Sequence, residues 1–184
     1  MRADSMTAKA RRVLVLALLL GAVAAPLARA QTFTVIHNFT GGSDGANPLA
    51  GFLIEGTTLY GTASSGGSSR HGVVFALNES GEETVLHEFT GGSDGASPEG
   101  LLVMDKAGNL YGTTYYGGQD GYGSVFKLTP TMGSWTYTSL HAFTGGLDGR
   151  YPGSSVVLDS QGNVYGTALA GGAYGLGVAF KIEQ

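Results

Sequence analysis

The sequence predicts an all-β protein in which three similar units form a β-propeller-like array, and three observations lead to this fold class. Glycine supplies 32 of the 184 residues, against five prolines and no cysteine. Helices are disfavoured, because each glycine inside a helix costs about 1 kcal/mol relative to alanine. Three short motifs recur three times in the same order, and no stretch beyond residue 30 has the 3.6-residue periodicity of an amphipathic helix.

Residues 1–30 have the pattern of a secretory signal peptide. Basic residues cluster at the start, an uncharged apolar run covers residues 13–25, and Ala28-Arg29-Ala30 supplies small residues where a signal peptidase cleaves. The apolar run is shorter than the roughly 20 residues that span a membrane. We therefore expect an exported mature chain that begins at Gln31 and has no membrane insertion after cleavage.

The expected mature chain is acidic. The sequence holds 10 basic and 14 acidic residues, and residues 1–30 contain five of the basic and one of the acidic ones, which leaves a net charge of −8. This charge opposes contact with phosphate backbones, so no nucleic acid is expected as a partner. No anchor motif follows the last repeat. We expect a periplasmic or extracellular protein.

The repeats make residues 31–184 a single domain of three units, at about 33–82, 83–133 and 134–184. The first motif, His-x-Phe-Thr-Gly-Gly-x-Asp-Gly, begins at His37, His87 and His141, and a proline follows three residues after its last glycine. A Leu/Val-Tyr-Gly-Thr motif comes next, and a Phe-x-Leu/Ile motif ends each unit. Self-similarity at this period is typical of propellers and related repeat folds.

Each unit is expected to contain four short strands. Alternating side chains indicate the first strand, a short apolar run the second, and the two later motifs the third and fourth. Glycine-containing turns separate the strands. The first strand of the three units is expected at residues 33–39, 84–89 and 136–143. The second is expected at residues 51–54, 101–104 and 155–158.

Four-stranded units of about 50 residues have the size of propeller blades, which bury their apolar faces by stacking. Propellers typically have four to eight blades, so three blades leave two faces uncovered. We therefore expect either an open arc or a homodimer that completes a propeller. A β-trefoil, which also has three four-stranded units, is the alternative fold.

The three motifs together resemble the GloVer tandem repeat of choice-of-anchor bacterial surface proteins. The resemblance covers residues 33–182 and rests on three copies of each motif. It implies an exported, β-propeller-like repeat protein whose biochemical role is not defined. Members of this family often carry more repeats and a C-terminal anchor. This sequence departs from that pattern, because it has three repeats and no anchor is expected after the third.

Repeated polar residues are expected to build the units. The histidines His37, His87 and His141 could in principle form a three-histidine zinc site, but local hydrogen bonds within each unit are the preferred interpretation, and no metal is expected. No cofactor is expected, and calcium, bound through carboxylates in the glycine-rich turns, is the alternative. The interpretation we prefer is that these carboxylates accept backbone N–H groups in structural turns; they are Asp44, Asp94, Asp148, Asp105 and Asp159.

Aromatic residues that are not repeated are the candidate binding residues. Exposed rings on loops suit stacking on a sugar face or docking of a partner protein. They are Tyr115, Tyr116, Tyr122, Trp135 and Tyr174.

These observations favour an exported, non-enzymatic scaffold or binding module for glycans or cell-surface proteins. No catalytic residue is assigned, because no acidic residue stands out from the repeats in a motif. Two alternatives remain: an extracellular polysaccharide hydrolase or lyase with carboxylates in a propeller groove, and a purely structural envelope protein. A carboxylate that departs from the repeat and faces a pocket would favour catalysis.

Overall fold

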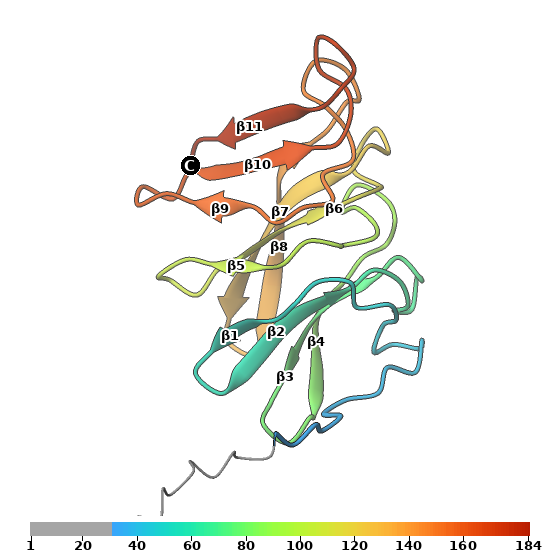
Figure 1. Ribbon diagram of the computed structural model, residues 1–184, viewed down its shortest axis with the longest axis vertical. Helices are drawn as coiled ribbons and strands as arrows, with labels where there is room; N and C mark the ends of the chain where they lie inside the picture. Colours follow the sequence, from blue (N-terminus) through green and yellow to red (C-terminus); the bar gives the residue numbers. More distant parts are fainter. Residues whose placement is uncertain (1–30) are drawn as a thin grey trace, which may run out of the picture. The chain divides into compact units, whose positions relative to one another are not determined.

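The computed structural model describes residues 31–184, of which Val35–Gln184 form one compact unit (Figure 1). The signal peptide expected at residues 1–30 lies outside the described residues. All regular structure between residues 31 and 184 is β-strand. In this part of the chain there is accordingly no helix long and apolar enough to traverse a bilayer.

The strands form three small antiparallel sheets that follow one another along the chain (Figure 1). The first sheet has the order β1-β2-β3-β4 and the second the order β5-β6-β7-β8. The third has the order β11-β10-β9. The strands are β1 (Leu53–Glu55), β2 (Thr58–Ala63), β3 (Val73–Leu77), β4 (Glu83–Glu88), β5 (Val103–Met104), β6 (Leu110–Thr114), β7 (Ser124–Thr131), β8 (Ser134–Ala142), β9 (Val157–Leu158), β10 (Val164–Ala168) and β11 (Val178–Ile182).

The sheets are offset by one strand from the sequence repeats. Strand β4 opens the second repeat but pairs with β3 of the first, and β8 pairs with β7 in the same way. The strand expected at residues 33–39 has the same place in the first repeat, and it does not form. Its partner strand would belong to a sheet that precedes β1, and residues 31–184 contain no such sheet. The third sheet has three strands because, among the described residues, none pairs with the outer edge of β11.

Apolar side chains fill the spaces between consecutive sheets. Phe89, Leu102 and Phe126 are buried in one cluster that also contains Val74 of the first sheet. An equivalent cluster joins the second and third sheets, and its buried members are Tyr111, Val125, Phe143, Val156, Val164 and Ala168. Each sheet therefore uses its neighbour to remove apolar surface from water, as stacked repeats do.

The glycine of the Leu/Val-Tyr-Gly-Thr motif makes room for a phenylalanine on the neighbouring strand. Gly112 lies opposite Phe126 in the β6–β7 ladder, and a β-carbon added at Gly112 would lie 2.5 Å from Cζ of that ring. The threonine that follows links successive units: the Oγ1 of Thr113 donates a hydrogen bond of 2.9 Å to the carbonyl of Ser154. The motif thus serves packing within a sheet and the connection to the next one.

The expected fold class is confirmed. The chain is all-β, and its three small antiparallel sheets are stacked as in a propeller-like repeat protein without closing into a barrel. The trefoil alternative was wrong, because no strand ladder joins one sheet to another within residues 31–184.

Candidate ligand-binding site

The repeated Asp of each Gly-Gly-x-Asp-Gly turn is bound by the Thr that precedes it. The backbone N–H and the hydroxyl of Thr40 both donate to Asp44, each over 2.6 Å. Asp94 and Asp148 receive the same two hydrogen bonds from their own threonines. Desolvation alone would raise the pKa of Asp44, but the bonds from Thr40 outweigh it and lower the pKa. Hydrogen bonds from Thr144 lower the pKa of Asp148 against desolvation in the same way, so the carboxylates of Asp44 and Asp148 are held ionised inside their turns.

The Asp residues of the two Asp-x-x-Gly-Asn hairpin turns are saturated in a similar way. Asp159 accepts hydrogen bonds from the backbone of Gln161, from the backbone and side chain of Asn163, and from the hydroxyl of Tyr165. These bonds, that of the Asn163 side chain foremost, lower the pKa of Asp159 to about 2. Asp105 has the same set of partners in the second unit.

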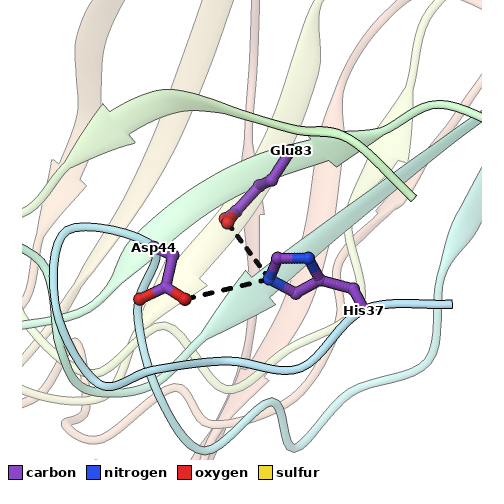
Figure 2. A group of neighbouring side chains, drawn as sticks. All are labelled: His37, Asp44 and Glu83. Carbon is purple, nitrogen blue, oxygen red and sulfur yellow. Dashed lines mark ion pairs between the residues drawn. The ribbon is translucent and has the colours of Figure 1, made fainter. Parts of the chain in front are cut away.

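The repeated histidine of the first unit lies between two carboxylates (Figure 2). The Nε2 atom of His37 is 3.3 Å from an oxygen of Glu83 and 3.9 Å from an oxygen of Asp44. Glu83 comes from strand β4, so the group joins the start of the first repeat to the start of the second. Burial raises the pKa of Glu83, the charge of His37 opposes this, and the charge of Asp44 adds to it.

The other two repeated histidines have one carboxylate each. His87 lies 3.4 Å from Asp94, and the ring of Tyr137 is stacked on it with 4.7 Å between the centroids. His141 lies 3.0 Å from Asp148. Glu83 pairs with Leu77 and Tyr137 with Leu128, so Glu83 and Tyr137 occupy equivalent ladder positions. Among the described residues, the group of potential metal ligands contains one histidine, His37, so the three repeated histidines do not form a common metal site.

Three of the five predicted aromatic residues gather around a tyrosine that sequence reasoning missed. The ring of Tyr115 is stacked on that of Tyr151, with 5.1 Å between the centroids and 10° between the planes. Tyr116 and Tyr122 approach the same ring at 5.6 and 6.1 Å. We call these four residues the tyrosine cluster. Its members come from the loops of two consecutive units.

Tyr151 has a backbone conformation that bulky residues rarely adopt. Its φ is 62°, and the equivalent Asn47 and Ser97 have φ values of 55° and 54°. Asparagine tolerates this left-handed region, whereas a tyrosine there stores strain. The backbone N–H of Tyr151 donates to the carbonyl of Tyr122, which holds the ring at the junction between the two units.

A pocket of about 290 Å³ lies beside the tyrosine cluster. Tyr115, Tyr151 and Glu99 line it together with the hydroxyl-bearing side chains of Ser154 and Thr167. Burial raises the pKa of Glu99. Desolvation is the main cause that raises the pKa of Tyr115, and the electrostatic effects of Tyr116, Glu99 and Tyr151 add to it. The pocket combines stacked rings with hydrogen-bonding groups, which is a composition typical of small-ligand sites.

The remaining two predicted aromatic residues lie elsewhere. Trp135 packs edge-on against Tyr60, with 6.2 Å between the centroids, and lines a more open hollow of about 650 Å³ at the hairpin ends of the first two sheets. Asp105 also lines that hollow, but its oxygens are occupied by its own turn. Tyr174 is 92% exposed. The structure therefore does not bring these two residues to the tyrosine cluster.

The sequence held a usable signal for the residues that were missed. Aligned by the proline that ends the first motif, Glu99 stands where the other units have Leu49 and Gly153. Tyr151 stands where they have Asn47 and Ser97. A comparison of the three copies position by position would have singled out both residues.

A family model described as the Gloeobacter/Verrucomicrobia repeat matches residues 21–184. The chain belongs to this family. The match agrees with the GloVer-type resemblance carried by the three motifs, and it covers all three sheets of this Gloeobacter/Verrucomicrobia repeat protein. A search of curated proteins finds no significant match.

Proposed function

We propose that this chain is an exported, non-enzymatic binding module that holds a glycan at the pocket beside the tyrosine cluster. The observation that carries the proposal is that repeated and non-repeated side chains have different surroundings. The repeated carboxylates are bound within their turns, whereas non-repeated Tyr115, Tyr151 and Glu99 line one pocket. Aromatic faces suit stacking against a sugar ring, and a carboxylate accepts hydrogen bonds from sugar hydroxyls.

Export is part of the proposal. Its support is the signal-peptide pattern of residues 1–30 and the resemblance of the three motifs to the repeat of choice-of-anchor surface proteins. A periplasmic or extracellular location would bring the module into contact with envelope or environmental polysaccharides. Fractionation of cells that express the full chain tests this, and a mature protein beginning at Gln31 outside the cytoplasm is the expected result.

A glycan array probed with residues 31–184 tests the binding function. We expect Tyr151→Asn to lower binding by at least about tenfold, as loss of a good stacking contact does. Asparagine occupies this position in the first unit with the same left-handed backbone, so the variant removes the ring and keeps the local conformation. Tyr174→Ala is the matched control and should bind as the parent protein does.

Three other outcomes would count against the proposed site. If Trp135→Ala abolishes binding and Tyr151→Asn does not, the ligand occupies the hollow at the hairpin ends. If a surface protein is retained and no glycan is, the partner is a protein. If the folded chain binds neither a glycan nor a surface protein, the purely structural role in the envelope is supported instead of a binding role.

A catalytic role is the second candidate, because Glu99 departs from the repeats and lines the pocket. Hydrolysis of a glycosidic bond ordinarily uses two carboxylic acids. Glu99 is the one carboxylate that lines this pocket in the part of the chain that the structure describes. This favours binding over hydrolysis. Release of shorter saccharides by the parent protein, lost in Glu99→Gln, would establish the catalytic alternative.

We also propose that a second copy of the chain completes the array. The support is the outer edge of β11, which no described strand covers, and the exposed segment at residues 33–36, with Phe33 90% exposed. By the registers of β3–β4 and β7–β8, Phe33 of the other copy would face Ile182. Light scattering of residues 31–184 should give a dimer. A strictly monomeric, non-aggregating protein would refute the dimer.

A further inference from the structure

We propose that His37, Asp44 and Glu83 form a binding site for a divalent transition-metal ion, with zinc as the ion to test. The three side chains offer one nitrogen and two carboxylate oxygens that all lie within 4.8 Å of one another (Figure 2). This site is distinct from the three-histidine arrangement, because it combines a single repeated histidine with a carboxylate of the following repeat.

The protonation of His37 suits a metal ligand. The Nδ1 atom of its ring lies 3.4 Å from the carbonyl oxygen of Gly81. A carbonyl oxygen can only accept, so Nδ1 carries a hydrogen, and Nε2, which faces the two carboxylates, is the nitrogen left to bind a metal ion. Histidines that bind metals typically donate their other ring N–H to a carbonyl or carboxylate in this way.

Two buried polar atoms in the group have no hydrogen-bond partner. They are the Nε2 of His37 and the Oε1 of Glu83. The side chain of Glu83 is only 8% exposed, so water does not readily compensate for the missing bonds. An unpaired buried polar atom costs free energy, and the cost is larger when the group is charged. A cation among the three side chains would bind Nε2 and offset the two negative charges. The Glu83 oxygen nearest to Nε2 is Oε2, so the ion would also satisfy Oε1 where the carboxylate binds through both oxygens.

The donor set and the distances favour zinc over calcium. Ligand atoms at about 2.0–2.2 Å from a tetrahedral zinc ion lie roughly 3.3–3.5 Å apart. The separations of 3.3 and 3.9 Å around Nε2 are close to this range, and Asp44 would have to move inward. The Asp44 oxygen nearest to Nε2 accepts one hydrogen bond, from the backbone of Thr40, and keeps a second lone pair for a metal ion. Three protein ligands would leave the fourth position to water. Calcium takes six to eight oxygen ligands, which this group does not provide.

The second unit supplies a natural comparison. His87 has the same contact with its Thr-bound Asp94, and Tyr137 stands where the first unit has Glu83. The residue on the following strand therefore decides whether a second carboxylate is present. We expect one zinc site per chain, in the first unit only.

Titration calorimetry of tag-free protein with residues 31–184 tests the inference, with zinc chloride as the probe. The expected result is one zinc ion per chain, and binding weakened by at least about tenfold in Glu83→Gln. His87→Gln is the matched control, and it should bind as the parent protein does. Calcium chloride should give no signal at the same site.

A gain-of-function variant keeps the test decisive if a loss variant folds poorly. Tyr137→Glu places a second carboxylate beside His87, so the zinc stoichiometry should rise from one to two per chain. Absence of zinc binding by the folded parent protein would overturn the proposal. Equal zinc affinity in the parent, Glu83→Gln and His37→Gln proteins would overturn it too.

Discussion

The first and second repeats share every motif, but they differ where their surroundings differ. In the second repeat, Phe89 is 1% exposed, because sheets lie on both sides of it. In the first repeat, the equivalent Phe39 is only half-buried. His87 is covered by the ring of Tyr137, whereas His37 faces Glu83. The comparison teaches that the motif determines the local turn, and that the adjacent strand determines whether an aromatic ring or a carboxylate faces the repeated histidine.

The largest difference is expected for the repeated phenylalanine. Phe89→Ala should destabilise the protein by about 3–5 kcal/mol, because it empties a fully buried position in the core between two sheets. Phe39→Ala should cost less than half as much, because the ring is already partly exposed to water. Urea unfolding of both variants measures the difference. Equal losses would contradict the view that a preceding sheet is missing beside the first repeat.

The next largest effect is expected at the turn before strand β4. Gly81 has a φ of 80°, and a β-carbon added there would lie 1.9 Å from the carbonyl oxygen of Ile36. Gly133, its counterpart before β8, has a φ of 84° and open space around it. Both alanine variants have the cost of a left-handed backbone, about 1 kcal/mol.

Only Gly81→Ala must also displace the segment that contains His37. We expect an additional loss of roughly 1–3 kcal/mol for this variant, as is usual for overpacking. Thermal unfolding of the Gly81→Ala and Gly133→Ala proteins separates the two contributions. If both variants have the same midpoint, the contact with Ile36 does not contribute to stability.

A smaller effect is expected at Tyr137. Its hydroxyl donates a hydrogen bond of 2.8 Å to the carbonyl of Asp94. Tyr137→Phe removes this bond and keeps the stacking on His87, so the free energy of unfolding should fall by about 1 kcal/mol. Zinc binding in the first repeat should not change. Chemical denaturation gives the first value and calorimetry the second; a change in zinc affinity would show that the two groups are coupled.

The smallest effect is the pH dependence of Glu83→Gln. The pKa of Glu83 is raised above its ordinary value of 4.5, so the folded state disfavours the ionised form. This unfavourable contribution is fully present above the folded-state pKa and disappears as the pH falls below the ordinary value.

Metal-free Glu83→Gln should therefore be more stable than the parent protein at pH 7. The gain should be no more than about 1 kcal/mol, because the charge of His37 offsets part of the cost of burying Glu83. At pH 3 the two proteins should unfold at the same temperature. Melting curves at both pH values check the sign. A Gln variant that is less stable at pH 7 would mean that the ion pair with His37 outweighs the burial of Glu83.

The sequence by itself determined the repeated β-structure and the turns. Strands and turns depend on local geometry, which neighbouring residues along the chain impose. The glycine content, the period of about 50 residues and the Asp-x-x-Gly-Asn motifs were therefore enough to predict them. Asp159 illustrates this, because all of its partners lie within six residues of it. The aromatic candidates Tyr115, Tyr116 and Tyr122 were also visible, because they break the repeat.

Only the tertiary structure decided which strand joins which sheet and which side chains meet. Strand β4 leaves its own repeat to pair with β3, and this places Glu83 beside His37, 46 positions away in the sequence. The same stacking brings Tyr115 and Tyr151 into contact and separates Trp135 from them. Such contacts depend on how apolar faces are buried between units, and a pattern read within one repeat does not contain that information.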